Sequence, residues 1–231
     1  MRVRRMTIIA ALAAALLTAS GCAAEAHPSP PTQETAMTDA THDLLTAAAA
    51  GEADAVRAAL DAGADIEARG SEGMTALVAA TKANHVDAAR ILIEAGADVN
   101  AKDDIQDSAY LYAGARGHDE ILVLTLEHGA DLKSTNRFGG TALIPASERG
   151  LLATVEILLE AGVDPNHVNN LNWTALHEAI VLGDGSPRYV DVVRALLDGG
   201  ADAGIPDGDG VLPVDLAASR GYDAIVSELQ R

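Results

Sequence analysis

The 231-residue chain contains little sulfur, few aromatic rings and few cations. Its one cysteine, Cys22, cannot form a disulfide within the chain, so packing alone must stabilise the fold. Lysine and arginine number 16 against 34 aspartates and glutamates, which gives a formal net charge of −18. Such a surface repels nucleic acid and anionic lipid head groups. We therefore expect no nucleic-acid binding, and we expect partner proteins to be neutral or basic.

The sequence also lacks the motifs of common catalytic sites. No Gly-x-Ser-x-Gly elbow, phosphate-binding loop or His-Glu-x-x-His occurs in it. In Asp207-Gly208-Asp209-Gly210 the glycine and the terminal glutamate have the wrong offsets for a calcium loop, and Asp-Gly is typical of a tight hairpin turn. His167 has no second ligand at metal-site spacing. We predict that the protein is not an enzyme and takes no metal and no cofactor.

No apolar run is long enough to cross a membrane as a helix. The longest lies between Ile8 and Ala19, follows three arginines and precedes small residues, which is the pattern of a secretory signal. Thr18-Ala19-Ser20-Gly21-Cys22 resembles the lipobox of bacterial lipoproteins, in which the cysteine is acylated. The resemblance implies export, with the lipid on Cys22 as the only membrane contact, on the periplasmic or extracellular side of a bacterial membrane. Ordinary cleavage, leaving a soluble exported protein, is the alternative.

These features divide the chain into three parts. Residues 1–21 are the predicted signal peptide. Residues 22–40 hold the cysteine and several prolines without hydrophobic periodicity, which predicts a flexible tether. Residues 41–231 form the predicted folded domain, which we expect to be a monomer.

The domain contains a repeated triplet. Gly63-Ala64-Asp65 returns at residues 96, 129 and 200, and as Gly-Val-Asp at residue 162, at intervals of 33, 33, 33 and 38 residues. A second landmark, Thr-Ala-Leu or a variant of it, keeps the same period. A unit of this length cannot bury its own apolar face, so neighbouring units must stack. We count six units, at about 43–70, 71–103, 104–136, 137–169, 170–207 and 208–231.

The second unit shows how each position is expected to act. Thr75 can cap a first helix, and Asn84 stands where left-handed backbone geometry is needed. A second helix is expected from Val86 to Ala95, ended by Gly96. These residues resemble the ankyrin repeat. The resemblance implies an all-α solenoid of about six helix-turn-helix units with projecting hairpin fingers, used for protein recognition and not for catalysis. Strings such as Asn166-His167-Val168-Asn169-Asn170 further resemble a bacterial subgroup of ankyrin proteins, here of the exported, lipoprotein type.

The scarce aromatic residues and a few arginines point to a binding surface. By alignment of the units, Phe138 and Trp173 lie on exposed fingers of units four and five, and Tyr112 lies on an inner helix of unit three. Aromatic residues and arginines on an acidic protein have the composition of a binding hot spot. The predicted partner-binding residues of the concave face are Tyr112, Arg116, Arg137, Phe138, Glu148, Arg149, Asn170, Leu171, Trp173 and Glu178.

Two alternatives remain open for these residues. Phe138 and Trp173 can instead pack against neighbouring fingers and stiffen them. The same groove can also serve a receptor for a small anionic or aromatic ligand, which a buried pocket lined by Tyr112, Phe138 and Trp173 would favour.

Unit five is longer than the others by five residues, and its Gly, Asp and Pro content predicts a loop from Gly183 to Tyr189. His85, His118 and His177 recur at fixed offsets of the repeat and are expected to be structural.

Overall fold

The computed structural model describes residues 38–231. The predicted signal, Cys22 and all but the end of the predicted tether therefore lie outside the described residues. Within residues 38–231, no helix combines the length and the apolar character needed to cross a membrane. The described part of the chain contains twelve α-helices and no strand, so the expected all-α class is confirmed.

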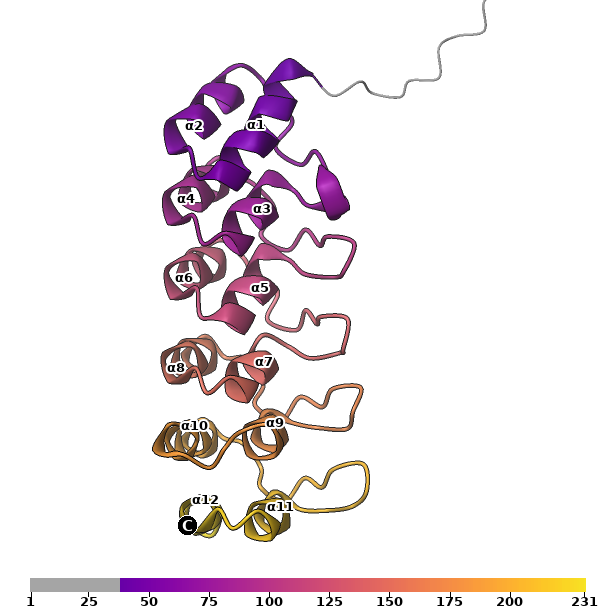
Figure 1. Ribbon diagram of the computed structural model, residues 1–231, viewed down its shortest axis with the longest axis vertical. Coiled ribbons are helices and arrows are strands. Elements are labelled where there is room, and N and C mark those ends of the chain that lie inside the picture. The colour runs from indigo at the N-terminus through magenta and orange to yellow at the C-terminus, as the bar shows by residue number, and fades with distance from the viewer. Residues whose placement is uncertain (1–37) are drawn as a thin grey trace, which may run out of the picture. The chain divides into compact units, whose positions relative to one another are not determined.

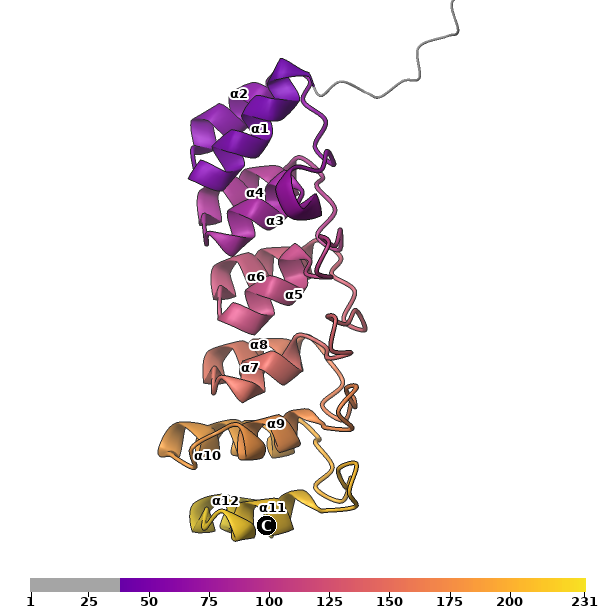
Figure 2. The ribbon, with the colours of Figure 1, turned by 45° about the vertical axis from the view of Figure 1, so that its right-hand side comes forward.

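The helices form six antiparallel pairs that stack in chain order (Figures 1 and 2). The odd-numbered helices form an inner layer beside the connecting fingers, and the even-numbered helices form an outer layer (Figure 1). The pairs are α1 (Asp39–Ala50) and α2 (Ala53–Asp61), α3 (Ala76–Lys82) and α4 (Val86–Glu94), α5 (Ala109–Arg116) and α6 (Asp119–Glu127), α7 (Leu143–Glu148) and α8 (Leu152–Glu160), α9 (Ala175–Val181) and α10 (Pro187–Asp198), α11 (Pro213–Ser219) and α12 (Asp223–Leu229).

The second pair shows why the helices begin and end where they do. The Thr75 hydroxyl accepts a hydrogen bond from the Val78 N–H at 3.3 Å and so caps α3, as predicted. Asn84, between α3 and α4, has a positive φ of 56°. Gly96 follows α4 with a φ of 94°, a conformation that costs glycine little and other residues much. The predicted boundaries of α4 are correct to within one residue.

The core runs through the whole stack as two columns of buried side chains. Each helix is too short to hold its shape without packing, so these columns supply most of the stability. The inner column includes Leu77, Leu143 and Leu176, with Tyr110 at the matching position of α5, and the outer column includes Val56, Leu92, Leu158, Leu196 and Ile225; all of them are fully buried or nearly so. Tyr110 takes the position that leucine holds in units two, four and five, and it is fully buried.

Five fingers connect the pairs, and four of them are closed in the same way. Their tips are Gly70–Met74, Asp103–Asp107, Asn136–Gly140, Asn169–Trp173 and Asp207–Val211, which we call the first to fifth fingers. In each finger the N–H of the first tip residue donates to the carbonyl of the last. In fingers two to five the first residue is Asp or Asn, and its side-chain oxygen accepts two further backbone N–H groups within the tip. The Asp207–Gly210 turn is therefore a finger tip, as predicted.

Side chains also join each unit to the next at the Gly-Ala-Asp turns. Glu67, Asn100 and Asn166 each accept a hydrogen bond from the backbone N–H of the aspartate in the following turn. Lys133 stands at the corresponding position between the third and fourth turns, and a lysine side chain has no acceptor. The outer helices at this junction, α6 and α8, also contact each other less extensively than α4 and α6 do.

The extra residues of unit five were predicted to form a loop from Gly183 to Tyr189, but the last three residues of that range are helical. Helix α10 begins at Pro187, because proline is favoured in the first turn of a helix, and α10 has 12 residues where α8 has nine. The Tyr189 hydroxyl donates to the Glu148 carbonyl at 2.9 Å. On the other side, the Tyr222 hydroxyl donates to the Gly183 carbonyl at 3.1 Å. The lengthened unit is thereby bonded to both of its neighbours.

Candidate partner-binding face

Three consecutive fingers expose an apolar side chain at the same position of the tip. Ile105 is 44% exposed, Phe138 is 56% exposed and Leu171 is 58% exposed. We call these three residues the tip row. Large apolar side chains in water are unfavourable unless another molecule covers them, so a regular row of them indicates a contact surface. The corresponding residues of the first and fifth fingers are Glu72 and Asp209, both exposed and acidic.

Contacts between the third and fourth fingers hold part of the tip row in place. The Asn170 N–H donates to the Phe138 carbonyl at 3.0 Å, which bonds one tip directly to the next. The Arg137 guanidinium lies over the Phe138 ring, 4.6 Å from its centroid. Four of the predicted residues, Arg137, Phe138, Asn170 and Leu171, are thus brought together on two neighbouring tips.

Trp173 does not belong to this exposed surface, and its expected exposure is corrected here. It is the last residue of the fourth tip, where the chain returns towards α9, and it is half-buried. Both its N–H and its carbonyl are used inside the finger, bonded to the side chain and the N–H of Asn169. Exposure therefore describes Phe138 and not Trp173. Packing of the Trp173 ring against a neighbouring finger stays a prediction.

Glu178 was expected on the open groove, but its side chain is buried, with only 5% of the residue exposed. It lies on α9, and its Oε1 accepts a hydrogen bond from the Asn169 side-chain amide at 2.8 Å. Burial and the neighbouring Glu148 carboxylate raise the pKa of Glu178 to about 7, against the opposing effects of the Asn169 hydrogen bond and the Arg149 charge. This carboxyl is a support for the fourth finger.

Glu148 and Arg149 lie at the end of α7 and are both partly exposed. They form an ion pair with each other at 3.4 Å, and Arg149 also donates to the Pro145 carbonyl at 3.3 Å. Arg149 was predicted to be a partner-binding residue. Its charge is partly satisfied by the adjacent Glu148 carboxylate.

Tyr112 and Arg116 form a separate group on α5. The Arg116 guanidinium lies 5.8 Å from the centroid of the Tyr112 ring, and the Lys82 ammonium lies 5.5 Å from it. The His118 ring meets the edge of Tyr112, and its Nδ1 bonds the Thr81 carbonyl of the preceding unit at 2.9 Å. Burial lowers the pKa of His118. The group joins two units and leaves the Arg116 side chain exposed to solvent.

Two further histidines, His167 and His177, also have structural positions. His177 is fully buried and forms a capping box with Thr174, so it bonds within its own unit and not between units. Burial lowers its pKa, which keeps the ring neutral. The His167 Nε2 bonds the Gly139 carbonyl at 2.7 Å, linking the third and fourth fingers. Among residues 38–231, no three His, Cys, Asp or Glu side chains are grouped closely enough to hold a metal ion.

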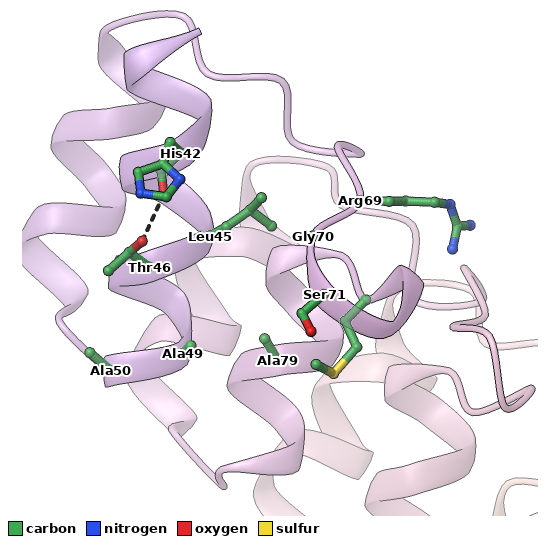
Figure 3. Close-up of a pocket in the computed structure, with 10 residues that line it drawn as sticks. His42, Leu45, Thr46, Ala49, Ala50, Arg69, Gly70, Ser71 and Ala79 are labelled. Atoms are coloured by element: carbon green, nitrogen blue, oxygen red, sulfur yellow. Dashed lines mark hydrogen bonds between the residues drawn. The ribbon is translucent and has the colours of Figure 1, made fainter. Parts of the chain in front are cut away.

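A pocket of about 760 Å³ lies at the other end of the same face (Figure 3). Helix α1, the first finger and Ala79 of α3 surround it, and its lining is mainly apolar. Figure 3 shows Leu45, Ala49, Ala50 and Ala79 around it, with His42 and Thr46 on α1. None of the predicted binding residues lines this pocket. It therefore does not provide the ligand site that the receptor alternative requires.

Sequence reasoning missed two residues of this face. Ile105 was not selected, although it stands two residues after Asp103 just as Phe138 stands two residues after Asn136. Asn169 was not selected either, although it organises the fourth tip and bonds Glu178. The signal for both was the alignment of the units at the tip, because it shows an Asp or Asn followed two residues later by an apolar residue in three consecutive fingers.

The chain matches a protein family profile and two solved structures. The family profile described as "Ankyrin repeats (3 copies)" matches residues 12–103 and 110–207. The chain is similar to an ankyrin repeat domain from Acinetobacter baumannii, with 56% identity and a TM-score of 0.79, over 81% of this chain and 95% of that one. It is also similar to a second solved ankyrin repeat protein, with 40% identity and a TM-score of 0.80, over 83% of this chain and 98% of that one. A search of curated proteins found no match.

Proposed function

Because the chain belongs to the ankyrin repeat family, whose repeats commonly serve as protein-interaction modules, we propose that it is a non-catalytic module that binds a partner protein. The proposed contact surface is the concave face, formed by the fingers and the adjoining side of the inner helices, over units three to five. The tip row is the observation that carries this proposal, because three exposed apolar side chains recur there in register. Arg116, Arg137 and Asn170 supply exposed polar contacts around it.

The arrangement suits a protein partner better than a small ligand. A small molecule binds in a concavity that encloses most of its surface. The tip row instead presents side chains on projecting fingers, where a large partner can reach all three at once. Central apolar and aromatic anchors of this kind dominate the binding energy of protein interfaces.

The test is to cross-link the full chain to its neighbours in the native cell envelope, capture the chain by affinity, and identify the bound proteins by mass spectrometry. The double variant Phe138→Ala and Leu171→Ala should weaken capture at least about thirtyfold, the equivalent of about 2 kcal/mol. Val123→Ala is the matched control, because Val123 is an apolar residue that is 38% exposed on the outer helix α6. Undiminished capture by the double variant, with the fold intact by circular dichroism, would exclude the tip row as the binding surface.

The second part of the proposal concerns location. The arginine-rich start, the apolar run and the Ala19-Ser20-Gly21-Cys22 string support export and acylation of Cys22. A lipid at this position would hold the domain on the periplasmic or extracellular side of a bacterial membrane, through the chain that precedes α1. Partners would then be proteins of the cell envelope.

A further inference from the structure

The tips of the five fingers differ in chemistry along the stack. Each tip has an exposed residue two positions after its first residue. From the first to the fifth finger these residues are Glu72, Ile105, Phe138, Leu171 and Asp209. Three apolar tips are therefore bounded on both sides by an acidic tip. The one exposed cation on these tips, Arg137, lies over the Phe138 ring and extends the apolar surface with its own side chain.

The spacing of the tips limits what can cover them. Successive inner helices pack directly against each other, and packed helices lie about 8–10 Å apart between axes. Because each finger joins one helix pair to the next, we expect the tips to repeat at about the same interval. On one face of a β-strand, neighbouring side chains lie about 6.6 Å apart and every second one about 13 Å apart. Neither distance matches the interval between the tips. In a helix, residues seven apart lie about 10.5 Å apart and nearly on one stripe, which does match.

Hydrogen bonds join each of the first three fingers to the next. The Asp104 N–H donates to the Glu72 carbonyl at 3.0 Å, and the Asn170 N–H donates to the Phe138 carbonyl at the same distance. Between the second and third fingers, the Lys102 ammonium donates to the Thr135 carbonyl at 2.7 Å. The row is thus pre-organised, so little conformational entropy is lost when a partner covers it.

We propose that the partner contacts this row with an amphipathic helix that carries apolar residues at seven-residue intervals and basic residues beyond both ends of that stripe. This inference rests on the proposed function and specifies the partner's chemistry. The three apolar residues cover Ile105, Phe138 and Leu171, and the two basic ends face Glu72 and Asp209. The strong negative charge of the chain favours the same partner through long-range attraction.

Synthetic helical peptides test the inference directly. The probe carries leucines at seven-residue spacing on an alanine and glutamine background, with two lysines at each end. One comparison peptide has glutamates in place of the lysines, and another has leucines five residues apart. Binding to the full chain is measured by fluorescence anisotropy at physiological salt. The lysine-flanked probe should bind about tenfold more tightly than either comparison peptide.

Charge reversal in the protein supplies the matched test. Glu72→Lys with Asp209→Lys should reverse the preference, so that the glutamate-flanked peptide binds more tightly. Glu94→Lys with Glu160→Lys, on the outer helices, makes the same change of charge and should leave the preference unchanged. Equal binding of all the peptides, no measurable binding of the probe below about 1 mM, or an unreversed preference would each overturn the inference.

The result is distinguishable from failure of the proposed function. If the Phe138→Ala and Leu171→Ala variant loses the native partner while the charge reversal leaves capture unchanged, the concave face binds but the helical, basic-ended partner is wrong. If the chain sediments as a dimer that Phe138→Ala dissociates, a second copy covers the row, which also overturns the inference.

Discussion

Asn169 bonds helix α9 and the tip of its own finger at once. Its side-chain amide donates to Oε1 of Glu178 at 2.8 Å, while its side-chain oxygen accepts the N–H groups of Leu171 and Trp173. The tip that exposes Leu171 is therefore attached to a buried carboxyl on α9. The protonation of that carboxyl and the stability of this region are linked.

The first prediction concerns pH. The pKa of Glu178 is about 7 in the folded chain, whereas a glutamate in an unfolded chain has a pKa of about 4.3. Between these values the folded state holds a proton that the unfolded state releases, so stability falls as pH rises through this window and levels off above it. The full shift corresponds to a loss on the order of 3 kcal/mol.

Glu178→Gln removes this titration and retains an acceptor for Asn169. We expect urea unfolding between pH 5 and pH 8 to show a flatter profile than wild type, with the gain at the alkaline end. Glu94→Gln, at an exposed position, should leave the profile of the wild type intact. Identical pH profiles for wild type and Glu178→Gln would show that this carboxyl does not carry the dependence.

The second prediction concerns the outer column of the core. Leu158 is fully buried on α8, and Leu158→Ala removes apolar contacts and leaves a cavity. We expect a loss of about 2–5 kcal/mol in the free energy of unfolding, measured by chemical denaturation. Val123→Ala shortens an exposed side chain on α6 and should cost about 0.5 kcal/mol or less. Similar midpoints for the two variants would contradict the assigned core.

The third prediction concerns closure of the third finger. The Asn136 side-chain oxygen accepts the N–H groups of Phe138 and Gly140 at 2.9 Å and 3.1 Å. Asn136→Ala removes both bonds and should cost about 1–2 kcal/mol, with faster amide exchange at these two N–H groups. Asn136→Asp retains the acceptor and should preserve the protection. Unchanged exchange in the alanine variant would show that the backbone alone closes the tip.

The fourth prediction concerns the anchor. Cys22→Ala should move the chain from the detergent-soluble membrane fraction to the soluble exported fraction. The melting temperature should not change, because the substitution lies outside the repeats. Fractionation of cells with and without detergent measures this. A wild-type chain that is already soluble without detergent would refute acylation of Cys22.

Much of the fold could be predicted from the sequence because the repeat restates each local signal. Thr75, Asn84 and Gly96 are local signals for a cap, a left-handed turn and a helix end, and their effects do not depend on distant residues. Buried leucines such as Leu158 follow from helical periodicity in the same way. The position of Pro187 could also have been read locally, since proline favours the start of a helix.

The candidate site was less predictable because exposure depends on the neighbouring unit. Trp173 and Phe138 both lie on fingers, yet only Phe138 lies at the outermost point of its tip. Glu178 occupies the inner-helix position held by Tyr112 in unit three, and its burial arises from Asn169 and the neighbouring α7. These differences come from side chains of adjacent units, which a repeat alignment does not weigh.

The lysine at position 133 has a mechanical consequence. Where Glu67, Asn100 and Asn166 fasten one turn to the next, Lys133 does not, and the outer helices α6 and α8 meet less extensively there. The hydrogen bond from the Thr154 hydroxyl to the Asp119 side chain, at 2.6 Å, still joins α6 and α8. Because their contact is otherwise small, we expect the solenoid to bend most easily at this junction. Because Asn170 still bonds the Phe138 carbonyl, bending would pivot on the finger edge and open the outer edge. The curvature of the concave face could then adapt to a partner while the distance between Phe138 and Leu171 is preserved.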